Sequence, residues 1–256
     1  MSPGREDVGS PVLLTQSASV DYELLCSLDV LGLVDTHEND QLEVYEEFKE
    51  QLGSSPAGWY ETKLPWKADH PMLPTNEDGS KRRLEQLIRK LERNGQCEEY
   101  DSIIQEQLQE EVVEAAPEVA TGKEFYIPHK GVTRENAEST KLRIVYDASA
   151  REKDNKPSLN DCLNPGPPRQ NRLWDILVRS RFYPVLLTGD LKKAFLQVRI
   201  KEEERDSLHF HWCPPNSSET SVLRFTRALF AMTCSPFLLG GVINQHLTHG
   251  KTNTLS

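Results

Sequence analysis

The sequence has few cysteines and no long hydrophobic run, and these absences exclude whole classes of protein. Its apolar runs fall well short of the roughly 20 residues that a membrane-spanning helix needs, so we expect no membrane partner. Residues 1–19 lack the apolar segment of a secretory signal peptide, which predicts an intracellular protein, in the cytoplasm or at the nucleus. The five cysteines are scattered and never form a Cys-x-x-Cys pair, which favours reduced thiols over a disulfide framework.

Acidic residues are absent from the last 37 residues, and the charge of the whole chain is uneven. Residues 1–119 hold 10 Lys and Arg against 26 Asp and Glu, a net charge of −16, whereas residues 120–256 hold 20 against 14, a net charge of +6. Phosphate binding needs a local positive potential rather than a basic whole protein. The basic half could therefore bind nucleic acid, although ordinary surface charge explains +6 equally well.

Composition and periodicity predict three regions. Residues 1–19 are typical of a disordered leader, and residues 20–119 form an acidic, mainly helical region. Within it we expect short amphipathic helices over residues 21–52, an irregular or short-stranded stretch over 53–80, and two longer helices. Leu84 to Leu91 mark the first of these, ended by Gly95, and Tyr100 to Val112 mark the second, ended by Pro117. Four glutamates lie on or beside the polar face of the second helix, and a solvated face is a better interpretation than a carboxylate site: Glu106, Glu110, Glu111 and Glu114.

The third region, residues 120–256, consists of short β-rich runs between polar turns. We expect strands at residues 125–127, 142–146 and 183–188, and a pair of strands at 207–212 and 221–225. Residues 173–178 open a helix, and residues 236–247 form an apolar one. Mixed strands and helices in this order predict an α+β fold.

Asp190 is the first candidate for chemistry, because it follows the apolar run 183–188. A carboxylate at the end of a strand, together with a backbone carbonyl, could hold Mg²⁺, and two such ions can support phosphoryl transfer. A turn or helix-cap role is the alternative for such an Asp. His209, His211 and Cys213 alternate along another strand and could bind zinc, but no fourth ligand is near, so an ordinary sheet face is favoured.

Four segments, in this order, resemble the reverse transcriptases of the BEL/Pao group of LTR retrotransposons. Two resemble fingers motifs, one resembles motif A of the palm, and one resembles motif B: residues 141–149 (KLRIVYDAS), 158–167 (SLNDCLNPGP), 185–195 (VLLTGDLKKAF) and 230–239 (FAMTCSPFLL). Residues 60–66 (YETKLPW) and 126–129 (YIPH) resemble the region before the polymerase. The resemblance covers roughly residues 20–250. It implies incomplete right-hand polymerase fingers and palm, preceded by a mainly helical region, and RNA-directed DNA polymerase activity.

The resemblance also implies roles for single residues. Asp190 would be the first metal-binding carboxylate, with the Leu191 carbonyl as a second oxygen for Mg²⁺. Phe195 would lie under the nucleotide sugar and exclude a 2′-hydroxyl, although a core Phe is the alternative. Arg143 would lie against the triphosphate of an incoming deoxynucleotide, although an exposed strand arginine is the alternative.

The motif B-like segment would contact the template–primer. Ser235 and Pro236 would open its supporting helix. Ala231 stands where the family usually has a glycine that lets the backbone approach the nascent base pair, so this contact is weakened in the present sequence.

The family completes its metal site with a downstream aromatic-x-Asp-Asp hairpin, and here the last acidic residue is Glu219. We therefore expect a fragment that ends before this motif and does not polymerise DNA by itself. Its expected partners are an RNA or DNA template–primer and deoxynucleoside triphosphates. A non-catalytic retroelement remnant or nucleic-acid-binding module is the second hypothesis. An acidic helical interaction protein, the third, fits residues 40–115 but leaves the motifs unexplained.

Overall fold

A computed structural model describes residues 38–55, 58–133, 142–215 and 217–253. Residues from Gln41 onward form one compact unit. The boundary predicted at residues 119–120 falls inside this unit, and the predicted leader lies outside the described residues. The mixture of helices and small sheets confirms the predicted α+β class. Among the described helices, none combines the length and the apolar character needed to cross a membrane.

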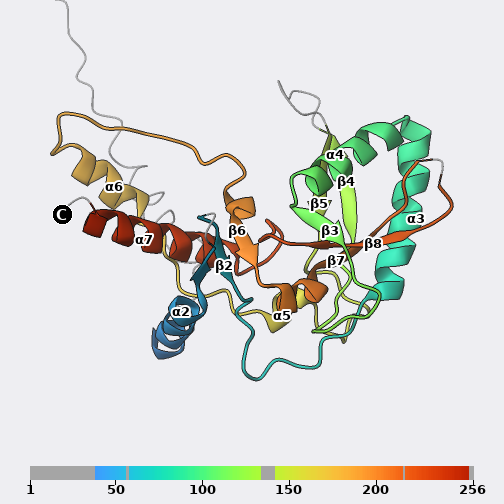
Figure 1. Cartoon of the computed structure of the whole chain (residues 1–256), viewed down its shortest axis with the longest axis horizontal. Coiled ribbons are helices and arrows are strands. Elements are labelled where there is room, and N and C mark those ends of the chain that lie inside the picture. The colour runs from blue at the N-terminus through green and yellow to red at the C-terminus, as the bar shows by residue number, and fades with distance from the viewer. Residues whose placement is uncertain (1–37, 56–57, 134–141, 216, 254–256) are drawn as a thin grey trace, which may run out of the picture. The chain divides into compact units, whose positions relative to one another are not determined.

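Figure 1 shows the helices along the chain. They are α2 (Glu38–Gln51), α3 (Glu77–Asn94), α4 (Cys97–Gln109), α5 (Leu159–Cys162), α6 (Leu173–Ser180) and α7 (Ser235–Asn253), with 3-10 turns η1 (Ala194–Gln197) and η2 (Glu202–Leu208). Gly95 ends α3 as predicted: its φ is 64°, and its N–H donates to the carbonyl of Glu92. The second long helix is shorter than predicted. It ends at Gln109, because Glu111 takes a left-handed conformation and Val112 turns toward a sheet.

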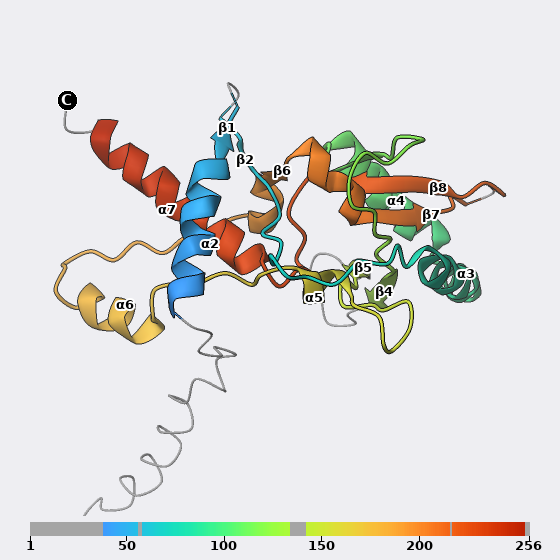
Figure 2. The same ribbon diagram turned by 90° about the horizontal axis from the view of Figure 1, so that it is seen from below.

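The strands form small sheets that join the two halves of the chain. They are β1 (Gly53–Ser54), β2 (Tyr60–Thr62), β3 (Val113–Ala115), β4 (His129–Thr133), β5 (Leu142–Tyr146), β6 (Val198–Ile200), β7 (His209–Trp212) and β8 (Ser221–Phe225). In the described chain the strand orders are β1-β2-β6, β3-β8-β7 and β4-β5. The predicted pairing of β7 with β8 is confirmed, and Figure 2 shows the two strands side by side. Because β3 pairs with β8 and β2 pairs with β6, the acidic and basic halves share sheets.

The segment predicted as a strand at residues 125–127 forms an isolated bridge instead. Tyr126 pairs with His209, and the Ile127 N–H donates to the His209 carbonyl at 2.7 Å. This short segment therefore pairs with the first residue of β7 and does not form a separate strand.

Aromatic side chains fill the core between α4, the β4–β5 hairpin and the β7–β8 pair. Phe210 and Phe225 lie 5.2 Å apart between ring centroids, and Tyr146 from β5 packs edge-on against Phe225 at 4.7 Å. Tyr100 from α4 stacks on Trp212 at 4.9 Å. Burying one such ring contributes about 1.5–3 kcal/mol, so this cluster fixes the hairpin against the sheet.

A buried carboxylate joins η2 to the central sheet. Asp206 is fully buried; one oxygen accepts from Arg224 at 2.8 Å, and the other accepts the N–H groups of Thr121 and Gly122. Burial alone would raise the pKa of Asp206, but these hydrogen bonds outweigh it and hold the pKa below its usual value. Arg224 continues the network to Glu114 at 2.7 Å. The charge is therefore retained because it is fully paired.

We expect Asp206→Asn to lower the free energy of unfolding by about 1.5–3 kcal/mol, because buried Arg224 keeps Glu114 but loses its other charged partner. Urea denaturation followed by tryptophan fluorescence measures this loss. Glu202→Gln is the matched control: its exposed carboxylate lies 3.6 Å from the same arginine, and its loss should change stability little. Equal losses in the two variants would contradict this account.

Candidate functional site

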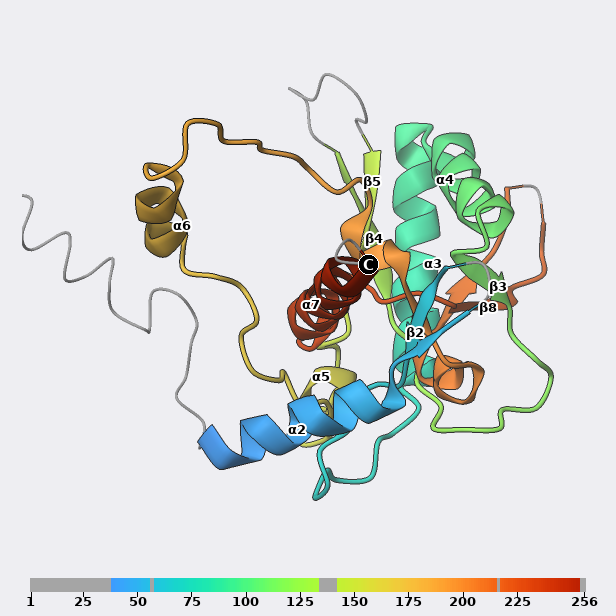
Figure 3. The same ribbon diagram turned by 60° about the vertical axis from the view of Figure 1, so that its left-hand side comes forward.

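The segment that carries Asp190 is exposed and irregular. Residues 183–188, predicted as a buried strand, form no strand, and all of residues 181–193 are exposed. Figure 3 shows α6 and the connection that follows it lying apart from the sheets. The prediction was wrong because an apolar run forms a strand only when another strand satisfies its backbone, and no described strand pairs with this one.

One basic residue near Asp190, Lys193, is anchored at the C-terminal end of α4. Lys193 forms ion pairs with Glu106 at 3.1 Å and with Glu110 at 2.6 Å. The hydrogen bond that Lys193 donates to the Glu110 carboxylate raises the pKa of Lys193. Glu106 on α4 and Glu110 directly after it thus hold a lysine at the surface, whereas the sequence predicted only a solvated helix face.

The residues around Asp190 lie at the surface. Asp190 and Leu191 are exposed, and no group of three or more His, Cys, Asp or Glu residues in the described chain could hold a metal ion. Mg²⁺ takes near-octahedral oxygen coordination and usually keeps several waters beside one or two protein carboxylates. Binding of Mg²⁺ at Asp190 stays a prediction, and we derive no chemical step from it.

Phe195 and the motif B-like segment lie in contact. Phe195 is half-buried, and its ring packs edge-on against Phe230 with centroids 5.3 Å apart. Phe230 itself is 85% exposed. The 3-10 turn after Asp190 therefore contacts the start of the motif B-like segment through two aromatic rings.

A second contact links the motif B-like segment to the fingers-like segment 158–167. The Asn160 amide donates to the Ala231 carbonyl at 3.0 Å, and its oxygen accepts the Thr233 N–H at 3.0 Å. These two hydrogen bonds fix the backbone on both sides of Met232. Ala231 is therefore held by its backbone, while its side chain is half-buried.

Ser235 and Pro236 begin α7 as predicted, but they face in different directions. Ser235 is fully buried, and its hydroxyl donates to the Leu229 carbonyl. Pro236 is exposed. Ser235 thus closes the turn before the helix, and Pro236 is the residue of this pair that solvent or a ligand can reach.

Gly166 packs directly against α7. Its φ is 70°, and a Cβ atom there would lie 2.3 Å from the ring of Phe237. Such a distance is shorter than any real contact. The fingers-like segment therefore approaches the motif B-like helix through a position that only glycine can occupy.

Arg143 lies on the outer face of the β4–β5 hairpin. It pairs with Val132, and Lys130 pairs with Val145. Because side chains alternate along a strand, these four residues share one face, while His129 and Tyr146 face the core. Arg143 is exposed on this outer face and, among the described residues, has no ion-pair partner.

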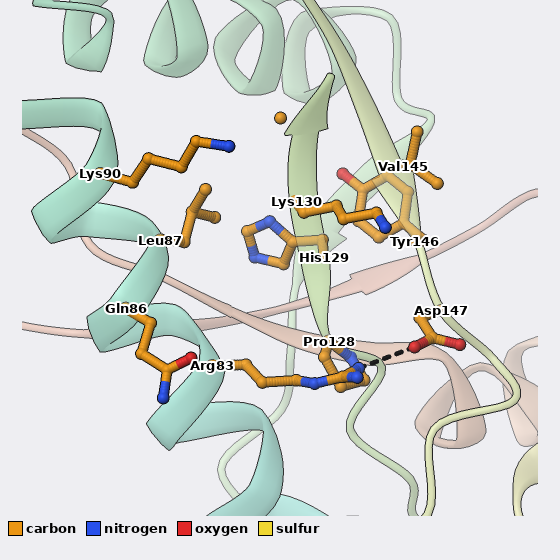
Figure 4. A pocket seen from close by; sticks show the side chains of 11 residues that line it. Arg83, Gln86, Leu87, Lys90, Pro128, His129, Lys130, Val145, Tyr146 and Asp147 are labelled. Atoms are coloured by element: carbon orange, nitrogen blue, oxygen red, sulfur yellow. Dashed lines mark hydrogen bonds and ion pairs between the residues drawn. The ribbon is translucent and has the colours of Figure 1, made fainter. Parts of the chain in front are cut away.

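A groove that sequence reasoning missed separates α3 from β4. It holds a cavity of about 500 Å³, and its charged lining residues are Arg83, Lys90, Lys130 and Asp147 (Figure 4). Arg83 forms an ion pair with Asp147 at 2.7 Å, across the groove. The signal was present in the sequence: Arg83, Leu87 and Lys90 follow helical spacing, so the two cations flank a buried leucine.

The histidines of β4 and β7 are buried rather than available to a ligand. His129 is hydrogen-bonded to the Tyr100 hydroxyl and to the His211 carbonyl, and burial lowers its pKa to about 4. His211 stacks on Tyr126 at 4.6 Å between centroids, and burial lowers its pKa to about 4 as well. His209 lies 3.4 Å from Asp206.

Comparison with family models finds no family that matches the chain. Comparison with curated proteins finds no relative.

We expect Gly166→Ala to lower the free energy of unfolding by about 2–4 kcal/mol, because a left-handed alanine is strained and its methyl group meets the Phe237 ring. Thermal unfolding monitored by circular dichroism measures the effect. Gly189→Ala is the control, since a Cβ there meets no atom within 4 Å. An unchanged melting temperature for Gly166→Ala would contradict the packing described here.

We expect stability to fall as the pH drops from about 6.5 to about 4. His129 and His211 stay neutral in the folded chain down to about pH 4, whereas in the unfolded chain they take up protons near pH 6.5. Their contribution is therefore complete above pH 6.5 and decreases through this window. Urea denaturation at several pH values measures it.

Substitution of either buried histidine tests the cause of this slope. His129→Gln or His211→Gln should each flatten it by up to about 1.4 kcal/mol per pH unit. His246→Gln, which changes an exposed histidine, should leave it unchanged. The account fails if all three variants keep the parent slope.

Proposed function

We propose that this chain is the fingers and part of the palm of a retroelement reverse transcriptase, and that it binds a primed nucleic-acid template without polymerising DNA by itself. The order of the four motifs along the sequence supports the lineage. Residues 220–256 hold no Asp or Glu, so the family's second carboxylate motif is missing from this sequence after motif B, and this supports the lack of activity.

The contact between segments 158–167 and 230–239 carries this proposal. Asn160 bridges Ala231 and Thr233, and Gly166 lies against Phe237. The resemblance selected these two segments from sequence alone, and a chance match would give no reason for them to pack together. Their direct contact therefore supports a shared origin as parts of one site.

Arg143, on the β4–β5 hairpin, is the candidate residue with the clearest ligand chemistry. It lies on an open face, and its planar guanidinium suits two oxygens of a phosphate. Lys130 lies on the same face of the hairpin. We propose that Arg143 contacts the triphosphate of a deoxynucleotide that pairs with the template, as the resemblance implies.

We expect the chain to bind a labelled primed template with salt-dependent affinity, measured by fluorescence anisotropy, and the next complementary deoxynucleoside triphosphate to tighten the complex. Arg143→Ala should remove this tightening and change template–primer affinity less than about twofold, because the arginine contacts the nucleotide. Arg179→Ala, at an exposed arginine of α6, should keep the tightening. A chain that shows no salt-dependent binding of primed template would refute the proposed function.

Primer extension tests the second half of the proposal. With Mg²⁺ and all four deoxynucleotides, the chain should extend the primer no further than Asp190→Ala does. Extension by the parent that disappears in Asp190→Ala would overturn the proposed inactivity and assign a catalytic role to this carboxylate.

A further inference from the structure

The groove between α3 and β4 is longer than the single cavity described above. A second cavity of about 400 Å³ adjoins the first and shares Leu87, Lys90, Lys130 and Gly131 with it. Its far end reaches Gln96, whose side chain lies 3.4 Å from the Thr133 hydroxyl. The Arg83–Asp147 pair lies at the other end. We call the two cavities together the α3–β4 groove.

The charge of the α3–β4 groove is positive on an acidic protein. Arg83, Lys90 and Lys130 line it, and Asp147 is the one acidic residue among its described lining residues. His129 also lines it, but burial lowers its pKa to about 4, so this side chain adds no charge at neutral pH. The whole chain carries a net charge of −10, so the positive potential of this groove is local. Anions would therefore be attracted to the groove rather than to the chain in general.

The two lysines have no competing partner within the described chain. Lys90 and Lys130 are exposed and take part in no ion pair there, unlike Lys81 on the opposite side of α3, which pairs with Glu77 at 2.5 Å. Arg83 does have a partner, but both members of its pair with Asp147 are about half exposed. Such an exposed pair contributes little, so an anion can displace the carboxylate.

The spacing of the cations favours an extended ligand. Arg83 and Lys90 are two helical turns apart, roughly 10 Å along the axis of α3. A compact triphosphate would engage one end of this line, whereas successive phosphates of one strand can engage both. Val145, exposed on β5, gives the groove apolar surface beside its charges.

From these observations we infer that the α3–β4 groove binds the backbone phosphates of a single nucleic-acid strand, through Lys90, Lys130 and Arg83. Asp147 acts as a competing anion that holds Arg83 until a phosphate replaces it. The inference rests on the proposed function in taking nucleic acid as the ligand, but it assigns residues to which the resemblance gives no role.

Fluorescence anisotropy of a labelled 12-residue oligothymidylate, at several salt concentrations, tests this assignment on the full chain. Lys90→Ala and Lys130→Ala should each weaken binding about fivefold and reduce the slope of log affinity against log salt by about 0.7, the value for one lost phosphate contact on a single strand. Asp147→Asn should do the opposite and tighten binding, because it frees Arg83. A merely structural role for Asp147 would not produce a gain.

Two controls match these variants. Arg89→Ala removes a cation from the same helix, next to Lys90, but outside the lining of the groove; Lys153→Ala removes an exposed lysine from the loop after β5. Both should keep parental affinity. Weakening by the controls equal to that by Lys90→Ala would overturn the inference, because it would indicate general attraction to the chain.

Competition with other anions in the same binding assay tests which ligand the groove prefers. Competition by deoxythymidine triphosphate or inorganic tripolyphosphate should be weaker than competition by unlabelled oligothymidylate. Stronger competition by either compact polyphosphate, or by an oligoglutamate peptide of equal length, would overturn the assignment to a strand backbone.

The failures of the two proposals are distinguishable. If primed template binds with parental affinity in both lysine variants and in Asp147→Asn, this inference fails and the proposed function stands. If the oligothymidylate binds with the expected dependence on the lysines, but a complementary deoxynucleotide never tightens the primed complex, the inference stands and the polymerase lineage loses its support.

Discussion

The antiparallel register of β4 and β5 determines which side chains enter the core and which remain available for binding. Pairing His129 with Tyr146 sends both rings inward, where they meet Phe210 at 5.4 Å and 5.3 Å. The same register sends Lys130 and Arg143 outward. A register shift of one residue would bury the two cations and expose the rings. The resulting loss in the free energy of unfolding would be enough to unfold a marginally stable domain. Aromatic packing on one side of the hairpin thus determines that the basic residues lie on the other side.

Apolar periodicity correctly predicted the elements whose stabilising contacts come from residues nearby in the sequence. Leu84, Leu87 and Leu91 bury one face of α3, and Gly95 supplies the left-handed residue that ends it, so local sequence was sufficient there. The pair β7–β8 was predictable because one polar turn joins two β-prone runs. The prediction of a strand at residues 183–188 was wrong for a physical reason. Its sequence is suited to a strand, but a strand must pair with another strand, and which strands lie side by side depends on the whole fold.

The candidate site was predictable in a similar, partial way. Sequence patterns indicated that Asn160, Ala231 and Ser235 belong to important segments, but not that an amide from one segment bridges the backbone of the other. The α3–β4 groove was missed because its cations come from two regions that sequence analysis had assigned to different domains. Charge counting placed α3 in the acidic half, where arginines and lysines are outnumbered, although two of its cations, Arg83 and Lys90, line the groove next to β4.

The pairing of distant strands has a consequence for how this polypeptide matures. Tyr60 of β2 pairs with Val198 of β6, 138 positions later, and Val113 of β3 pairs with Phe225 of β8. A ribosome adding about 5–20 residues per second needs on the order of ten seconds to make the intervening chain. During that interval α3 and α4 can form from local contacts, but β2 and β3 wait as unpaired edges. During this period the unpaired edges of the nascent chain are open to pairing with other chains.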